Sequence, residues 1–335
     1  MNRMRNSETV PSDRLIRQRM TRLVCTICYS SWVSLLLGGQ PLVLAQDVSS
    51  PSSALMERGM AAFQRGAFET AIQTWPQAVE HDEESSQTGT NIHTRCLLLV
   101  RLARTYQALG QHDQAAQHLE HALAIARKAG DAEQHATVLA ALGHLHTSTG
   151  RLATAEAYLV EGLGLAQQYP QLRATLLNTL GNVFSRQHKY SQALVCYEQG
   201  AQLANDQPAL LATILTNKAT TAFQTQQYEQ AYQYFQKAQE QLRRLEPSHD
   251  TIYSLITVGL GYRKLQTSLP DKRTTLGLQA FSVLQQAAGT AESLQDRRPL
   301  SNAWGYWGAL YEERGQYQDA LALTRRSLYT AGNGR

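Results

Sequence analysis

One pattern recurs seven times along this chain, and it restricts the possible folds more than any other feature of the sequence. In each copy a small residue precedes a turn signal, which is followed by an alanine, a bulky residue and a second small residue. The alanines that mark the copies are Ala71, Ala115, Ala155, Ala193, Ala231, Ala280 and Ala320, spaced by 44, 40, 38, 38, 49 and 40 residues. A period of this length is typical of stacked helix–turn–helix units, each of which needs a neighbour to bury its apolar face. We therefore expect an all-α solenoid.

The fourth copy shows how each unit is built. Leu177 and Gly181 lie four residues apart before a turn signal at residues 187–189, and Ala193 and Tyr197 have the same spacing after it. This spacing places each pair on one face of a helix, so the unit is predicted to be two amphipathic helices. Small residues at 181 and 193 would let the two helices approach closely, and added bulk there would overpack the contact.

The same positions in the other copies resemble the tetratricopeptide repeat family. The second and last copies carry this resemblance clearly, through Leu99, Leu102, Ala103, Tyr106, Gly110, Ala115 and Ala122, and through Trp304, Trp307, Gly308, Tyr311, Gly315, Tyr317 and Ala320. The resemblance implies a right-handed superhelical solenoid of about seven repeats, near residues 54–81, 94–127, 134–167, 172–205, 208–244, 250–290 and 299–331. The spacing exceeds the family's usual 34 residues, so we expect longer helices, as in kinesin-light-chain-like arrays.

The first 45 residues have the composition of a secretory signal peptide. Arginines are concentrated in residues 14–22, residues 23–39 are largely apolar, and small or modest side chains precede Gln46. We expect cleavage before Gln46 and export to the periplasm or the outside of the cell. Residues 46–53 are rich in serine and include a proline, so they are expected to form a flexible linker.

Two alternatives remain open for this segment. It could be retained as a membrane anchor, although polar residues interrupt an apolar stretch that would need about 18 uninterrupted residues. The true start could also be Met20, because the part before it is long for a signal peptide.

The net positive charge of the chain comes from residues 1–45. The whole sequence has a formal net charge of +4, but residues 1–45 hold six arginines and two acids, which leaves 25 basic and 25 acidic side chains in the remainder. A neutral remainder gives no electrostatic reason to expect nucleic acid or anionic lipid as a partner. Contact with a membrane is expected only through an uncleaved signal segment.

Two cysteines, Cys96 and Cys196, remain after the expected cleavage. They fall in the second and fourth repeats, and neighbouring helices are separated by about 8–10 Å. A disulfide needs Cα atoms within about 7 Å. We therefore expect two buried free thiols.

Three stretches depart from the regular pattern. Pro76 falls inside the second helix of the first repeat, where a kink is expected. Residues 80–90 are polar and acidic and are expected to form a loop. The sixth repeat has extra residues around 268–272, which predict either a loop or a lengthened helix.

The sequence contains no motif that indicates catalysis. It lacks a phosphate-binding loop, a Gly-x-Ser-x-Gly elbow and a His-Glu-x-x-His pair, so the chain is expected to be neither an enzyme nor a cofactor protein. His112, His118 and His121 could present imidazoles to a metal, but no further ligand completes the set and a solvated surface is favoured. Packing roles are favoured for His146, Trp304 and Trp307.

The resemblance implies a binding surface on the concave side, lined by the first helix of each repeat. Carried over position by position, the candidate peptide-binding residues are Arg104, His144, Asn178, Asn182, Arg186, Arg263 and Lys264. Asparagine side chains can donate to and accept from a peptide backbone, and an arginine can pair with a carboxylate. The alternative is that these side chains are merely solvated in a groove.

Two functions of different classes follow from the resemblance. The first is an exported, non-enzymatic scaffold that binds protein or peptide partners. The alternative is a recognition arm of a secreted caspase-like (CHAT) peptidase system, whose catalytic domain would lie elsewhere. A third, weaker expectation is self-association through the last repeat, because no polar capping helix follows Leu328.

Overall fold

The computed structural model describes residues 51–85 and 91–332. The predicted signal peptide and residues 46–50 lie outside the described residues. The described part contains fourteen α-helices and no β-strand, which confirms the all-α prediction. None of these helices is both long and apolar enough to cross a bilayer.

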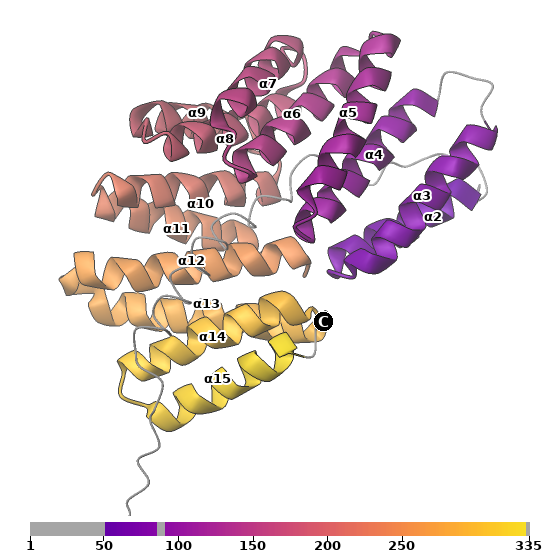
Figure 1. The fold of residues 1–335 in the computed structure, drawn as a ribbon. Coiled ribbons are helices and arrows are strands. Elements are labelled where there is room, and N and C mark those ends of the chain that lie inside the picture. Colours follow the sequence, from indigo (N-terminus) through magenta and orange to yellow (C-terminus); the bar gives the residue numbers. More distant parts are fainter. Residues whose placement is uncertain (1–50, 86–90, 333–335) are drawn as a thin grey trace, which may run out of the picture.

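The helices form seven consecutive antiparallel pairs (Figure 1). The pairs are α2 (Pro51–Gln64) with α3 (Phe68–Ser85), α4 (Asn91–Ala108) with α5 (His112–Ala129), α6 (Ala132–Ser148) with α7 (Leu152–Leu165), α8 (Pro170–Arg186) with α9 (Tyr190–Leu203), α10 (Pro208–Gln224) with α11 (Tyr228–Leu242), α12 (His249–Ser268) with α13 (Arg273–Ser293), and α14 (Arg297–Glu313) with α15 (Tyr317–Gly332). We refer to the pairs as units one to seven.

Small residues set the spacing within each pair, as the repeat pattern predicted. All seven marker alanines are buried. A Cβ atom added at Gly181 would lie 2.5 Å from the ring of Tyr197, and one added at Gly143 would lie 2.5 Å from Leu159. A larger side chain would therefore have to push the two helices of the pair apart. The apolar clusters span neighbouring units, so the core runs along the solenoid instead of gathering in one centre.

Six of the seven turns between paired helices contain a residue in the left-handed backbone conformation. Gly110 supplies it in unit two at φ +78°, whereas His188 occupies the corresponding turn of unit four at φ 60°. This conformation ends helices readily when glycine holds it and costs more for other residues. The turn expected at residues 187–189 is therefore confirmed.

The irregular stretches differ in part from expectation. Helix α2 begins at Pro51, inside the stretch expected to be a flexible linker. Helix α3 continues through Pro76 to Ser85, so residues 80–85 are helical and the loop prediction was wrong for them. The reason is composition, because glutamates at 80, 83 and 84 favour helix. Residues 86–90 lie outside the described part.

The extra residues of the sixth unit extend its helices. Helix α12 has 20 residues and α13 has 21, with a short 3-10 helix, Pro270–Lys272, between them. Lengthened helices therefore accommodate most of the insertion. Cys96 and Cys196 are both buried and free, as expected.

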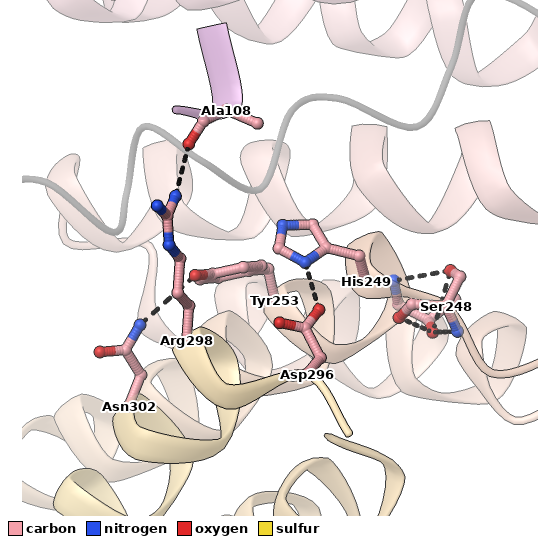
Figure 2. A network of polar contacts seen from close by, with 8 residues as sticks. Ala108, Ser248, His249, Tyr253, Asp296, Arg298 and Asn302 are labelled. Atoms are coloured by element: carbon pink, nitrogen blue, oxygen red, sulfur yellow. Dashed lines mark hydrogen bonds and ion pairs between the residues drawn. The ribbon is translucent and has the colours of Figure 1, made fainter. Parts of the chain in front are cut away.

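The solenoid curves until its early units meet its late units (Figure 1). Arg298 of α14 donates a hydrogen bond from Nη1 to the backbone carbonyl of Ala108, at the end of α4 (3.1 Å). The ring of Phe68 in α3 packs edge-on against His249 of α12, with centroids 4.8 Å apart. Nδ1 of His249 in turn lies 2.5 Å from Oδ2 of Asp296 (Figure 2). We call this set of contacts the closure.

Candidate ligand-binding cavity

A cavity of about 390 Å³ lies beside the closure, where units one and two face units five and six. Its lining side chains come mainly from the first helices of these units, which is the surface that the sequence predicted to be concave. They are Met60, Phe63, Gln64, Trp75, Arg101, Arg104, Ala209, Thr213, Leu242, Leu245, Glu246, Pro247, Ser248, Asp250, Thr251 and Ser254. The cavity therefore combines an apolar wall with a few charged and hydroxyl groups, as ligand sites usually do.

Two arginines from α4 supply the positive charge. Arg101 and Arg104 are three residues apart and project from one face of the helix. Burial lowers the pKa of Arg101 to about 10, and the nearby charge of Arg104 acts in the same direction. Burial also lowers the pKa of Arg104, whereas Asp250 opposes that shift. Both guanidinium groups nevertheless remain charged at neutral pH.

The surroundings of the two guanidinium groups differ. The guanidinium carbon of Arg104 lies 6.0 Å from the ring centroid of Phe63, within the range of a cation–π contact. Nε of Arg101 is buried and has no hydrogen-bond partner among the described residues. A buried donor of this kind is uncommon in folded proteins.

The start of α12 positions the acidic side of the cavity. Ser248 Oγ accepts from the backbone N–H of Thr251 (3.2 Å), and Thr251 Oγ1 accepts from the backbone N–H of Ser248 (2.8 Å). This capping box fixes the first turn of the helix. Asp250 lies in that turn, and its Oδ1 is buried without a hydrogen-bond partner among the described residues.

His144 lies next to the arginines as a neutral group. Gln107 donates from Nε2 to His144 Nδ1 (3.3 Å), which joins α4 to α6. Burial, followed by the positive charge of Arg104, lowers the pKa of His144 to about 4. The imidazole is therefore uncharged at neutral pH and can act there only as a hydrogen-bonding group.

The structure separates the predicted binding residues into different environments. Arg104 lines the cavity and His144 is its neighbour. Asn178 and Asn182 are buried at 4% and 6% exposure. Oδ1 of Asn178 accepts from Asn217 Nδ2 (3.1 Å), and Oδ1 of Asn182 accepts from Tyr197 OH (2.7 Å). These amides therefore join helices of the solenoid.

The remaining candidates lie elsewhere on the inner helices. Arg263 of α12 donates from Nε to Glu313 Oε1 of α14 (2.8 Å), so its charge is already paired. Lys264 is exposed, and Arg186 is partly buried near the end of α8. The seven predicted residues thus do not form one site.

Sequence reasoning missed Arg101 and Asp250. Arg101 could have been found, because it lies one helical turn before Arg104 on the same face. Asp250 could not, because nothing local shows that α12 faces α4 across the closure.

Two of the histidines and both tryptophans considered for other roles pack against neighbours, whereas His121 is exposed. His118 stacks on Tyr106 at 5.3 Å, and His146 stacks on Tyr158 at 5.4 Å. Trp304 and Trp307 are partly buried against the core of the late units. The described residues contain no group of three or more histidine, cysteine, aspartate or glutamate side chains that could hold a metal ion.

Helix α15 exposes several apolar side chains, including Leu328 at 68% and Tyr329 at 74%. This is the surface where the sequence predicts self-association, which stays a prediction.

Family comparisons agree with the repeat assignment. A tetratricopeptide repeat family model matches residues 93–168 and 136–206, and a second matches residues 212–241. No curated protein sequence matches the chain significantly.

Solved structures share the fold at low sequence identity. The apo form of RapI is 15% identical with a TM-score of 0.55, over 84% of this chain and 98% of that one. The Rap conjugation gene regulator of the plasmid pLS20, in complex with the Phr* peptide, is 16% identical with a TM-score of 0.59, over 97% and 86%. The tetratricopeptide repeat sensor protein PH0952 from Pyrococcus horikoshii, a signal transduction ATPase, is 17% identical with a TM-score of 0.51, over 84% and 42%.

The repeat positions, the seven helix pairs and the family matches therefore agree that residues 93–206 and 212–241 of this chain form tetratricopeptide repeats.

Proposed function

We propose that this chain is a non-enzymatic scaffold that binds a peptide, or an extended segment of a protein, on its inner surface, and that the cavity beside the closure is the main binding site. The observation that carries the proposal is the cavity itself. Its walls combine apolar side chains with hydrogen-bonding groups, among them Arg101 Nε and Asp250 Oδ1, which have no partner among the described residues. Binding would need no cofactor.

The comparison with the pLS20 regulator supports this proposal, because that protein was solved with a peptide bound. At 16% identity the likeness extends to the fold alone. Peptide binding by the present chain therefore rests on its own cavity, and it requires a direct test.

Selection from a displayed library of short random peptides, with the full chain immobilised, tests the proposal. Ala209→Trp places a large ring in the cavity and should abolish capture of the selected peptides. Val195→Trp is the matched control, because Val195 is 56% exposed and does not line the cavity. The proposal fails if no peptide is selected, or if the selected peptides bind the Ala209→Trp variant as well as the wild-type chain.

We also propose that the chain is exported, on the basis of its basic and apolar N-terminal segments. Intact mass and N-terminal sequencing of the protein from its native cells test this. A species that begins at Gln46 supports export with cleavage. A species that retains residues 1–45 contradicts cleavage.

A further inference from the structure

We infer that the cavity binds a carboxylate group of its ligand, held by Arg101 and Arg104, and that an amide N–H beside this carboxylate donates to Asp250. This inference rests on the proposed function, which makes the ligand a peptide, and it adds the chemical class of the group that the cavity recognises.

The charged side chains that line the buried part of the cavity are not balanced. Helix α4 contributes two positive groups, Arg101 and Arg104, whereas α12 contributes one negative group, Asp250. His144 is neutral because burial and Arg104 lower its pKa. Glu246 lies exposed at the rim, where water screens its charge. The buried part of the cavity therefore has two positive charges and one negative charge, which leaves an excess of one positive charge.

Two buried polar atoms of the cavity, Arg101 Nε and Asp250 Oδ1, have no hydrogen-bond partner among the described residues. Buried charges in folded proteins are normally paired or hydrogen-bonded, because removing them from water is costly. Neither Arg101 nor Arg104 forms an ion pair within the described residues, and Arg101 Nε has no hydrogen-bond partner there. Asp250 Oδ1 is a buried acceptor that also has no hydrogen-bond partner among the described residues. The cavity thus presents free donors and a free acceptor together.

The charges and free groups of the cavity match a carboxylate with an amide beside it. A guanidinium presents a planar set of N–H donors that matches the two oxygens of a carboxylate. A single carboxylate balances the one excess charge, whereas a phosphate dianion would exceed it. Asp250 can accept an amide N–H, and Met60, Phe63 and Leu242 can contact an apolar side chain. An N-acylated amino acid has this combination of groups, as does a peptide at its carboxyl terminus or at an acidic residue.

The inference also predicts the stability of the free protein. If Arg101 served only the fold, its replacement should lower stability. If Arg101 instead serves to bind a ligand, Arg101→Met should leave the melting temperature unchanged or raise it, because the substitution removes an uncompensated buried charge. Arg58→Met is the control, because Arg58 is an exposed cation on α2.

Thermal-shift measurements on the full chain test the inference with N-acetyl-leucine and N-acetyl-leucinamide, which differ only in the carboxylate. N-acetyl-leucine should raise the melting temperature of the wild-type chain and of Arg58→Met, whereas the amide should not. Arg101→Met and Arg104→Met should each weaken this binding by about tenfold or more. Equal effects of the acid and the amide would overturn the inference, as would an equal effect of inorganic phosphate or full binding by both arginine variants.

The peptides selected above separate this inference from the proposed function. If they need the cavity, contain an essential carboxylate and fail to bind Arg101→Met, both proposals are supported. If they need the cavity but bind Arg101→Met unchanged, the carboxylate assignment fails and peptide binding stands. If no peptide is selected although N-acetyl-leucine binds, the carboxylate site stands and the proposed function fails.

Discussion

Arg298 Nη1 donates a hydrogen bond to the backbone carbonyl of Ala108, which lies 190 residues earlier in the chain, at 3.1 Å (Figure 2). This bond joins unit seven to unit two. Together with the packing of Phe68 against His249, it holds the early and late helices face to face. The candidate cavity exists because these distant units meet, so the closure and the binding site depend on each other.

Gly66 and Gly110 offer a matched test of the closure. Both have positive φ, +75° and +78°, so alanine should cost each about 1–2 kcal/mol from the backbone alone. A Cβ at Gly66 would also lie 2.3 Å from Oδ2 of Asp296, whereas one at Gly110 would meet nothing within 4 Å. Gly66→Ala should therefore be less stable than Gly110→Ala by a further 1–3 kcal/mol or so in urea unfolding. Equal losses would mean that unit one does not pack against Asp296 in solution.

Asn182 should prove to stabilise the fold. Its Oδ1 accepts from the hydroxyl of Tyr197, which is 1% exposed. Asn182→Ala would remove this hydrogen bond from the buried hydroxyl and should lower the free energy of unfolding by about 1–3 kcal/mol. In a double-mutant cycle the loss should be smaller in a Tyr197→Phe background, because the hydroxyl is then absent. Additive effects of the two substitutions would show that this hydrogen bond does not contribute.

Stability should fall in mild acid because of His144. Its folded-state pKa is about 4, below its ordinary value of 6.5, so the unfolded chain binds a proton first as the pH drops. Stability from this group is present above pH 6.5 and is lost progressively toward pH 4, by about 2–3 kcal/mol.

The variant His144→Gln removes this titration and should flatten the pH dependence between pH 6.5 and 4, measured by urea unfolding. Burial lowers the pKa of His118, His135 and His146 as well, so part of the loss should remain. His121→Gln changes an exposed histidine and should follow the wild-type curve. If His144→Gln also follows that curve, the imidazole is not buried beside Arg104.

The two free thiols should resist alkylation in the folded protein. Burial raises the pKa of both Cys96 and Cys196 to about 11, so little reactive thiolate is present near pH 8. Iodoacetamide should modify both residues rapidly in denaturant and very slowly without it, as followed by mass spectrometry of the peptides that contain them. Rapid labelling of Cys196 alone in the native protein would indicate local opening between units three and four, where Cys196 packs.

The sequence predicted the parts of this structure that depend on local spacing. Seven helix pairs followed from the repeat, because contacts within a pair, such as that of Gly181 with Tyr197, use residues close together in the chain. Arg104 was found because it faces inward on a first helix. Asn178 and Asn182 also face inward, but they bond to Asn217 and Tyr197, and repeat position alone does not show such contacts.

The closure could not be predicted in the same way. It results from small rotations that accumulate from one unit to the next, and no local sequence pattern predicts the total rotation. The pairing of Arg263 with Glu313 joins the first helices of neighbouring units six and seven, and repeat position alone does not show which side chains pair there.

Hydrogen–deuterium exchange of the full chain, with and without a selected peptide, tests the central claim most directly. Bound peptide should slow backbone exchange in the helical segments that line the cavity. These segments are residues 60–64 of α2, 101–104 of α4 and 248–254 at the start of α12. Slower exchange confined to the second helices of the units or to α15, with exchange in these segments unchanged, would contradict the claim that the cavity beside the closure is the binding site.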